Sequence, residues 1–111
     1  MWFNPFMRES DLMILVESSD DSPAITLSVS GNFDFSVMMS FQDAFNQGQA
    51  NFSQFIVDLD GVDYMDSSAL GMLLQLKEFA GNVPVTIKTS KKDVLEILRI
   101  SNFAQMFTVV S

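Results

Sequence analysis

The strongest constraint in this sequence is a hydrophobic pattern that switches repeatedly between a period of two residues and a period of 3.6. The first period is typical of strands and the second of helices. Strands are predicted at residues 12–17, 24–30, 54–59 and 83–88, and helices at about 36–47, at 67–80 and from Ser90 onward. The order β-β-α-β-α-β-α, followed by an apolar C-terminal segment, predicts an α/β fold with a small mixed sheet and helices packed on it.

Turn residues predict where the strands and helices begin and end. The Asp-Asp-Ser-Pro turn at 20–23 joins the first two strands as an antiparallel hairpin, and Gly31 ends the second strand. Asp60-Gly61 is predicted to open a loop after a strand that ends near Leu59. Ser36 is a plausible N-cap, Gly48 a C-cap, and Ser90-x-x-Asp93 resembles a capping box. The helix over 36–47, the helix from Ser90 and the tail are expected to place the following residues in the core: Met38, Phe41, Phe45, Val94, Leu95, Ile97, Leu98, Phe103, Phe107, Val109 and Val110.

Length and composition narrow the possible functions. The 111 residues suit one domain, and a formal net charge of −8 argues against binding to nucleic acid or to anionic membranes. The absence of Cys and His excludes disulfides, thiolate zinc sites, cysteine nucleophiles and Ser-His-Asp catalysis. No basic region precedes an apolar stretch near the N-terminus, and no apolar run approaches the ~20 residues of a membrane span, so a cytoplasmic protein is predicted.

Four aspartates lie close together at the C-terminal end of the third predicted strand: Asp58, Asp60, Asp63 and Asp66. Their spacing does not fit a calcium loop, which needs a glycine at its sixth position and a glutamate at its twelfth. A single Mg²⁺ ion, which needs only one or two carboxylates, stays open. The alternative is that Asp66 caps a helix while the other three carboxylates are solvated in a loop.

A pair of hydroxyls follows Asp66. With Asp66 at the N-cap, Ser67 and Ser68 occupy the first turn of the helix over 67–80. Backbone N–H groups there are unpaired and the helix dipole is positive, so a phosphate on either hydroxyl would be tolerated locally. The simpler interpretation is that two small polar residues start a helix well.

The faces of this helix bear on that choice. A helical wheel places Met72, Gln75 and Phe79 near Ser68, with Gly71 on the same side. The opposite side carries the predicted buried stripe of Ala69, Leu70, Leu73, Leu74 and Ala80. The Ser68 side is therefore expected either to pack under neighbouring helices or to form a protein-docking surface, where Gly71 would let another backbone approach.

These residues resemble a known family. The segment Asp66-Ser67-Ser68-Ala69-Leu70-Gly71, preceded by the apolar strand FIVDL, is similar to the signature of STAS domains, specifically of bacterial anti-sigma factor antagonists. The segments VSGNFD (29–34) and LEILRISNFAQMFTV (95–109) resemble two further elements of that family, although Ala69 stands where the family commonly has glycine. The resemblance implies one STAS domain over residues 11–111 and an N-terminal extension over residues 1–10.

The resemblance also implies a partner-switching role without enzymatic activity, cofactor or metal. Such a protein, when unphosphorylated, binds an anti-sigma factor or a related serine kinase regulator; phosphorylation at the helix start releases it, and a PP2C-type phosphatase restores binding. Carried over to this chain, the acceptor is Ser68 or Ser67, with Ser68 favoured because Met72 and Phe79 share its face. Asp34 matches a family aspartate that helps partner or kinase engagement, and Asp66 orients the acceptor. The full set of expected partner-binding residues is Asp34, Asp66, Ala69, Gly71, Met72, Gln75 and Phe79.

Two other functions stay open at this point. One is a STAS binding subunit of a transport or sensory assembly whose serine is never phosphorylated. The other is an enzyme that uses Ser68 and the carboxylates directly, although the chain offers no obvious activated nucleophile, general base or phosphate-binding glycine loop. The unbound protein is expected to be a monomer.

Overall fold

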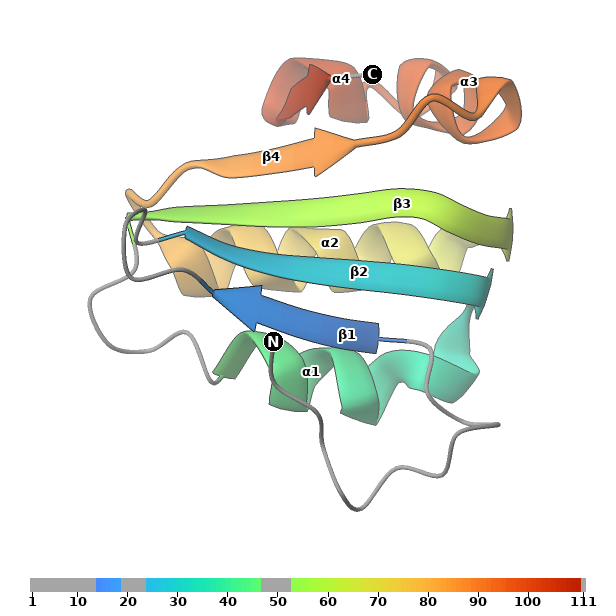
Figure 1. The fold of residues 1–111 in the computed structure, drawn as a ribbon. Coiled ribbons are helices and arrows are strands. Elements are labelled where there is room, and N and C mark those ends of the chain that lie inside the picture. The colour runs from blue at the N-terminus through green and yellow to red at the C-terminus, as the bar shows by residue number, and fades with distance from the viewer. Residues whose placement is uncertain (1–13, 19–23, 47–52, 111) are drawn as a thin grey trace.

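The computed structural model describes residues 14–18, 24–46 and 53–110, and within them a five-stranded mixed sheet in the order β1-β2-β3-β4-β5 (Figure 1). β1 (Ile14–Ser18) pairs antiparallel with β2 (Ala24–Phe33), which confirms the predicted hairpin. The turn at 20–23, the expected C-cap Gly48 and the N-terminal extension at 1–10 lie outside the described residues. β3 (Gln54–Met65), β4 (Val85–Lys88) and β5 (Thr108–Val110) then add in parallel, each beside the previous strand.

The helices follow the predicted order. A short 3₁₀ helix, η2 (Phe35–Val37), leads into α1 (Met38–Asn46), and α2 (Ser67–Ala80) has the predicted bounds. α3 (Lys92–Ile100) and α4 (Phe103–Met106) complete the chain's helices within the described residues. Figure 1 shows α2 running along the back of the sheet with α1 below it, while α3 and α4 lie beyond β4. The expected α/β fold is thus confirmed, and the tail, for which the pattern predicts only an apolar segment, forms α4 and β5.

The core lies between one face of the sheet and the helices. Alternate residues of β2 and β3 are buried, as period-two patterning requires: Ile25, Leu27 and Val29 on one strand, Phe55, Val57 and Leu59 on the next. Phe41 and Phe45 of α1 pack edge to face with ring centroids 5.7 Å apart. Not every expected core residue is buried: Met38, Leu95, Ile97 and Val109 are half-buried, and Val110 is 43% exposed because it ends the edge strand β5.

Two predicted strand ends are wrong, and both errors concern the same pair of strands. β2 does not stop at Gly31, which adopts a φ of 77°, but continues to Phe33. β3 does not stop near Leu59 but continues to Met65, paired with β2 through two register shifts. The shifts give β3 extra residues while Val62 and Met65 stay buried, so the aspartates at 60 and 63 lie on an irregular strand rather than in a loop.

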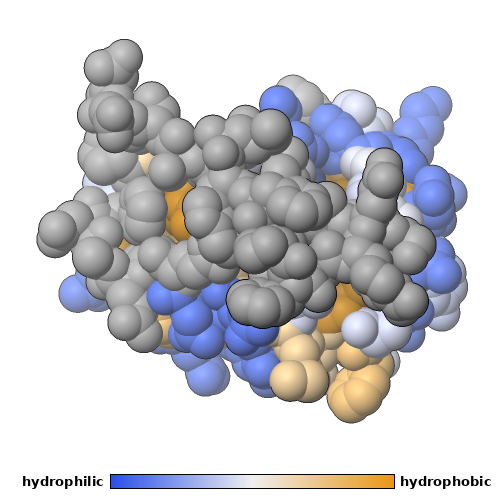
Figure 2. Space-filling view, turned by 60° about the horizontal axis from the view of Figure 1, so that its bottom comes forward, coloured by the Kyte–Doolittle hydropathy of each residue, from blue (hydrophilic) through white to orange (hydrophobic). Residues whose placement is uncertain are grey.

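Among the coloured atoms of Figure 2, hydrophilic residues occupy much of the rim of the molecule, and pale orange, hydrophobic atoms are exposed together at the lower edge. Among the described residues, the most exposed large hydrophobic side chains are Met39 (77%), Phe35 (69%) and Ile100 (67%). Phe35 and Met39 are four residues apart across η2 and the start of α1, so they share one helical face.

Candidate functional site

The carboxyl ends of β2 and β3 meet at one edge of the sheet. Phe33 of β2 is paired with Met65 of β3, so the next residues, Asp34 and Asp66, leave the sheet side by side. Each of these aspartates starts a helix, η2 in one case and α2 in the other. The carboxyl edge of parallel strands is where α/β sheets usually place ligands and partners, so this edge is the candidate site.

Asp66 caps α2 as the sequence predicted. Its Oδ1 accepts hydrogen bonds from the backbone N–H of Ser68 at 3.0 Å and of Ala69 at 3.4 Å, and from the Ser68 hydroxyl at 2.5 Å. These bonds, with the hydroxyl bond foremost, hold the pKa of the Asp66 carboxyl below its usual value. Asp66 is therefore an ionised acceptor at neutral pH, and the half-buried Ser68 hydroxyl is oriented toward it; Ser67, one residue earlier, is exposed.

Asp34 repeats this arrangement on the neighbouring strand. Its Oδ1 accepts from the Ser36 backbone N–H at 2.9 Å and from the Ser36 hydroxyl at 2.5 Å. The N-cap is therefore Asp34 and not Ser36, contrary to the sequence prediction. The repeated Asp-x-Ser pattern at 34–36 and 66–68 is visible in the sequence and could have revealed both caps.

The Ser68 side of α2 was expected either to pack under neighbouring helices or to form a docking surface, and two of its residues, Met72 and Phe79, are packed. Met72 is fully buried in the core, so it cannot be reached by a partner in this conformation. Phe79 is 36% exposed and packs its ring against Phe45 of α1, 5.0 Å away between centroids, and against Phe55 of β3 at 6.2 Å. The helical wheel failed because α1 covers part of the side near Ser68, which turns the buried stripe of α2 toward that helix. That stripe consists of Ala69, Met72, Leu73, Leu76 and Ala80, while Leu70 and Leu74 are half-buried.

The remaining α2 residues of the predicted surface are accessible. Gly71 is exposed, and a methyl group added at its Cα would meet nothing within 4 Å. Gln75 is exposed as well, and its side-chain oxygen accepts from the Gln42 amide of α1 at 2.9 Å. This bond fixes α1 beside α2. Ala69, on the opposite side of α2, is fully buried and, like Met72, cannot be reached by a partner in this conformation. The partner-contact roles of Gly71, Gln75, Asp34 and Asp66 stay predictions.

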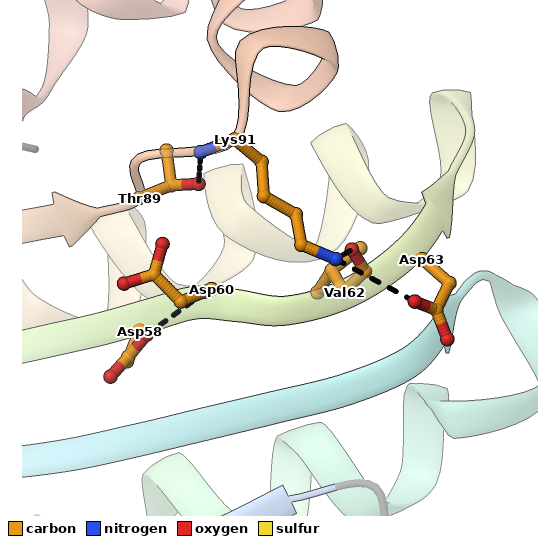
Figure 3. Close-up of polar contacts among 6 residues, drawn as sticks. All are labelled: Asp58, Asp60, Val62, Asp63, Thr89 and Lys91. Atoms are coloured by element: carbon orange, nitrogen blue, oxygen red, sulfur yellow. Dashed lines mark hydrogen bonds and ion pairs between the residues drawn. The ribbon is translucent and has the colours of Figure 1, made fainter.

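The aspartates of β3 tie this strand to the connection between β4 and α3 (Figure 3). Asp58 accepts from the backbone N–H of Asp60 at 2.9 Å. Asp60 in turn accepts from Ser90, through its backbone N–H at 2.6 Å and its hydroxyl at 3.1 Å. The backbone N–H of Ser90 is the main reason that the pKa of Asp60 lies below its usual value. The expected capping box is accordingly absent, because Ser90 bonds to Asp60 and α3 begins after Lys91 without a side-chain cap.

Lys91 makes a second tie between the same segments. Its Nζ donates to the backbone oxygen of Val62 at 2.5 Å and lies 3.6 Å from the Asp63 carboxylate, as Figure 3 shows. Its backbone N–H donates to the hydroxyl of the buried Thr89. Within the described ranges, no group of three or more carboxylates is arranged to hold a metal ion. Asp60 and Asp63 bond to the segment between β4 and α3, which the sequence did not reveal.

A cavity of about 560 Å³ lies beside the site, between residues 62–65 of β3 and the first turns of α3. Its floor is apolar, from Val62, Met65, Val94 and Ile97. Met65 also directly precedes the α2 cap, so the cavity adjoins the start of that helix.

Taken together, the mixed sheet and the two aspartate-capped helix starts at its carboxyl edge define a small α/β domain with hydroxyl groups presented at one end. The family model described as "STAS domain" matches residues 14–111, and the chain therefore belongs to the STAS domain family. In the part of the chain that the structure describes, no helix is both long and apolar enough to cross a membrane.

Individual proteins agree with this assignment. A STAS-domain containing protein of Pseudomonas aeruginosa (strain UCBPP-PA14) is 39% identical over 93 residues, covering 82% of this chain and 92% of that protein. An anti-sigma factor antagonist from Mycobacterium paratuberculosis has a similar structure, with a TM-score of 0.77 at 20% identity over 87% of this chain and 83% of the other. The unphosphorylated form of the antagonist SpoIIAA gives a TM-score of 0.67 at 13% identity, over 88% of this chain and 86% of the other. These two structures show a shared fold.

Proposed function

We propose that this protein is an anti-sigma factor antagonist controlled by phosphorylation of Ser68. It binds an anti-sigma factor, or a related serine kinase regulator, while Ser68 carries a free hydroxyl, and a PP2C-type phosphatase regenerates that form. The protein is cytoplasmic, is a monomer when unbound, and has no catalytic step of its own. The observation that carries the proposal is the 2.5 Å hydrogen bond from the Ser68 hydroxyl to the α2 cap, Asp66, at the carboxyl edge of the sheet.

Phosphorylation would change this contact directly. A partner kinase transfers the γ-phosphoryl group of ATP to Ser68 Oγ: the new bond is O–P, the bond to the β-phosphate breaks, ADP leaves, and the hydroxyl proton goes to a base of the kinase. The product cannot donate to Asp66, and it adds about −1.5 to −2 charges beside that carboxylate. Asp66 and the phosphate repel each other, so the first turn of α2 must rearrange.

The rearrangement supplies the switch. The phosphate oxygens can themselves accept from the backbone N–H groups of the first turn, so α2 keeps an N-terminal anion while the surface around it changes. A partner that packs against the hydroxyl form would have to desolvate a dianion to bind the phosphorylated form. Loss of binding with an intact fold is the expected result.

Purification from the native cells, followed by intact-mass measurement and site mapping, tests the proposal. One phosphate on Ser68 in a fraction of the molecules is expected, and the partner should copurify with the unphosphorylated fraction only. A single phosphate on Ser67 would move the switch by one residue.

Matched variants test the consequence. Ser68→Glu should weaken binding to the copurified partner at least tenfold, whereas Ser67→Glu should have a smaller effect because that side chain is not bonded to the cap. Circular dichroism should be unchanged for both. If neither phosphorylation nor Ser68→Glu changes the affinity for the partner, the protein is instead a constitutive STAS subunit of a transport or sensory assembly.

A further inference from the structure

An apolar pair of side chains stands exposed next to the site. Phe35 follows the cap Asp34 directly, and Met39 lies one helical turn further on; they are 69% and 77% exposed. Asp43, also exposed, extends the same row by another turn. We call Phe35, Met39 and Asp43 the acidic–apolar surface.

The part of the chain that carries this surface has charges of one sign only. Residues 24–76 contain no Lys or Arg, and their charged side chains are the carboxylates of Asp34, Asp43, Asp58, Asp60, Asp63 and Asp66. Two cations lie among the β3 aspartates: Lys91, which reaches across from the start of α3 to Val62 and Asp63, and Lys88 of β4, the register partner of Asp58. Neither forms a described contact with Asp34 or Asp43. The cap Asp34 and the row end Asp43 therefore flank Phe35 and Met39 with negative charge.

We infer that the acidic–apolar surface binds a protein whose complementary surface is an apolar socket rimmed by Lys or Arg. This inference rests on the proposed function and names the chemistry of its partner. Phe35 and Met39 fill the socket, since aromatic residues and methionine are the types enriched at the centres of protein interfaces. Asp43 and Asp34 pair with the basic rim and raise the rate of encounter at low salt.

The same charges argue against other occupants. A second copy of this chain would bring two rows of like charge together, on molecules that each carry a formal net charge of −8. A nucleic acid or an anionic bilayer would be repelled for the same reason. A basic protein surface is the occupant that satisfies both the apolar pair and the carboxylates around it.

Nuclear magnetic resonance on the ¹⁵N-labelled, unphosphorylated full-length chain tests this chemistry even while the partner is unidentified. The probe is a short amphipathic helical peptide of Leu and Lys, compared with Leu/Glu and Ser/Lys peptides of the same length. Backbone signals of residues 34–43 should shift with the Leu/Lys peptide, and the shifts should weaken as salt is added. Equal binding of the Leu/Glu peptide, shifts confined to other residues, or no shift with any peptide would overturn the inference.

Variants locate the binding to particular side chains. The double change Phe35→Ser, Met39→Ser should weaken Leu/Lys binding about tenfold or more, while Ile100→Ser, at an equally exposed position on α3, should not. Asp43→Lys should weaken binding several-fold, and Asp93→Lys on α3 should not. If the double variant binds like the wild type, or if sedimentation shows a dimer that only this variant abolishes, the surface serves another occupant. No kinase takes part in the peptide experiment. A negative result in it would therefore not count against phosphorylation of Ser68, and the absence of phosphate on Ser68 would not count against peptide binding.

Discussion

The Ser68 hydroxyl lies 2.5 Å from Oδ1 of Asp66, and it can either donate to that carboxylate or carry a phosphate ester, but not both. In the free-hydroxyl form, the bond lowers the pKa of Asp66 and holds the hydroxyl in one direction. The stability of the first turn of α2 therefore depends on whether the Ser68 hydroxyl, the proposed acceptor, is free or phosphorylated.

Removing the hydroxyl should raise the pKa of Asp66. Ser68→Ala deletes the largest of the interactions that lower it, leaving the weaker bonds from the backbone N–H groups of Ser68 and Ala69. Carboxyl ¹³C shifts followed against pH should show the Asp66 midpoint move upward, toward the ordinary value of an aspartate. Asp60 is the internal control, because its lowered pKa comes from Ser90 and should not change. An unmoved Asp66 midpoint would mean that the hydroxyl is not bonded to it in solution.

Because the pKa of Asp66 is lower in the folded protein, the stability that the Ser68 bond contributes depends on pH. A carboxyl whose pKa is lower in the folded state contributes stability above its unfolded pKa, and this contribution disappears as the pH falls through the folded value. The advantage of the wild type over Ser68→Ala should therefore be constant near neutral pH and should shrink below about pH 4. Urea unfolding at a series of pH values measures it.

Among the secondary-structure elements, the two register shifts between β2 and β3 do the most to shape the site. They let β3 run to Met65, and Gly61 lies at the first of them, opposite Ser30. A methyl group at Gly61 would come within 2.9 Å of Ser30 Cβ and 3.2 Å of the Val29 carbonyl oxygen. Backbone and Cβ atoms cannot move aside as a flexible side-chain tip could, so the strands would have to separate.

Gly61→Ala should consequently destabilise the protein by about 1–3 kcal/mol. Gly71→Ala is the matched control: the added methyl meets nothing, and alanine in a helix interior should stabilise by about 0.5–1 kcal/mol. Urea denaturation of both variants gives the comparison. The prediction fails if Gly61→Ala is as stable as the wild type, which would mean that β2 and β3 are further apart at the shift than the structure has them.

The sequence was sufficient for whatever depends on regular periodicity. The alternating run from Ile25 to Val29 predicted a half-buried strand, and the bounds of α2 were found from its cap at Asp66 and its stop at Gly81. The sequence was insufficient to predict features that depend on how a neighbouring strand or helix packs. Nothing in DGVDY announces a strand, because that segment is held by β2 through irregular pairing. Met72 is buried because α1 covers one side of α2, and a helical wheel contains no information about its neighbour.

Considered as a whole, the molecule separates its charges along the chain. The first part of the described fold, from β2 to the middle of α2, carries carboxylates alone, whereas five of the chain's six basic residues follow it: Lys77, Lys88, Lys91, Lys92 and Arg99. Within the described residues, ion pairs form at Lys91–Asp63 and at Arg99–Glu96, and only the first of them reaches an aspartate of residues 24–76. Asp58 also faces Lys88 across β3 and β4, and both Lys88 and Lys91 act on Asp60. Among the described residues, like-charge repulsion is therefore least compensated at Asp34, Asp43 and Asp66.

This repulsion should be measurable as a salt dependence of folding. Added NaCl screens exposed like charges, with a Debye length that falls from about 30 Å at 0.01 M to about 8 Å at 0.15 M. The urea midpoint should therefore rise over that range by about a few tenths of a molar unit.

Two substitutions separate the acidic half from the rest of the molecule. Asp43→Asn removes one repelling charge from the acidic–apolar surface, so it should raise the midpoint at low salt and make it less sensitive to NaCl. Asp93→Asn removes a carboxylate that the first turn of α3 favours, so it should lower the midpoint instead. A midpoint that falls with NaCl, or two variants that shift in the same direction, would show that the carboxylates of residues 24–76 are balanced in the folded protein. In that case the inference that the partner carries a basic rim would lose its support as well.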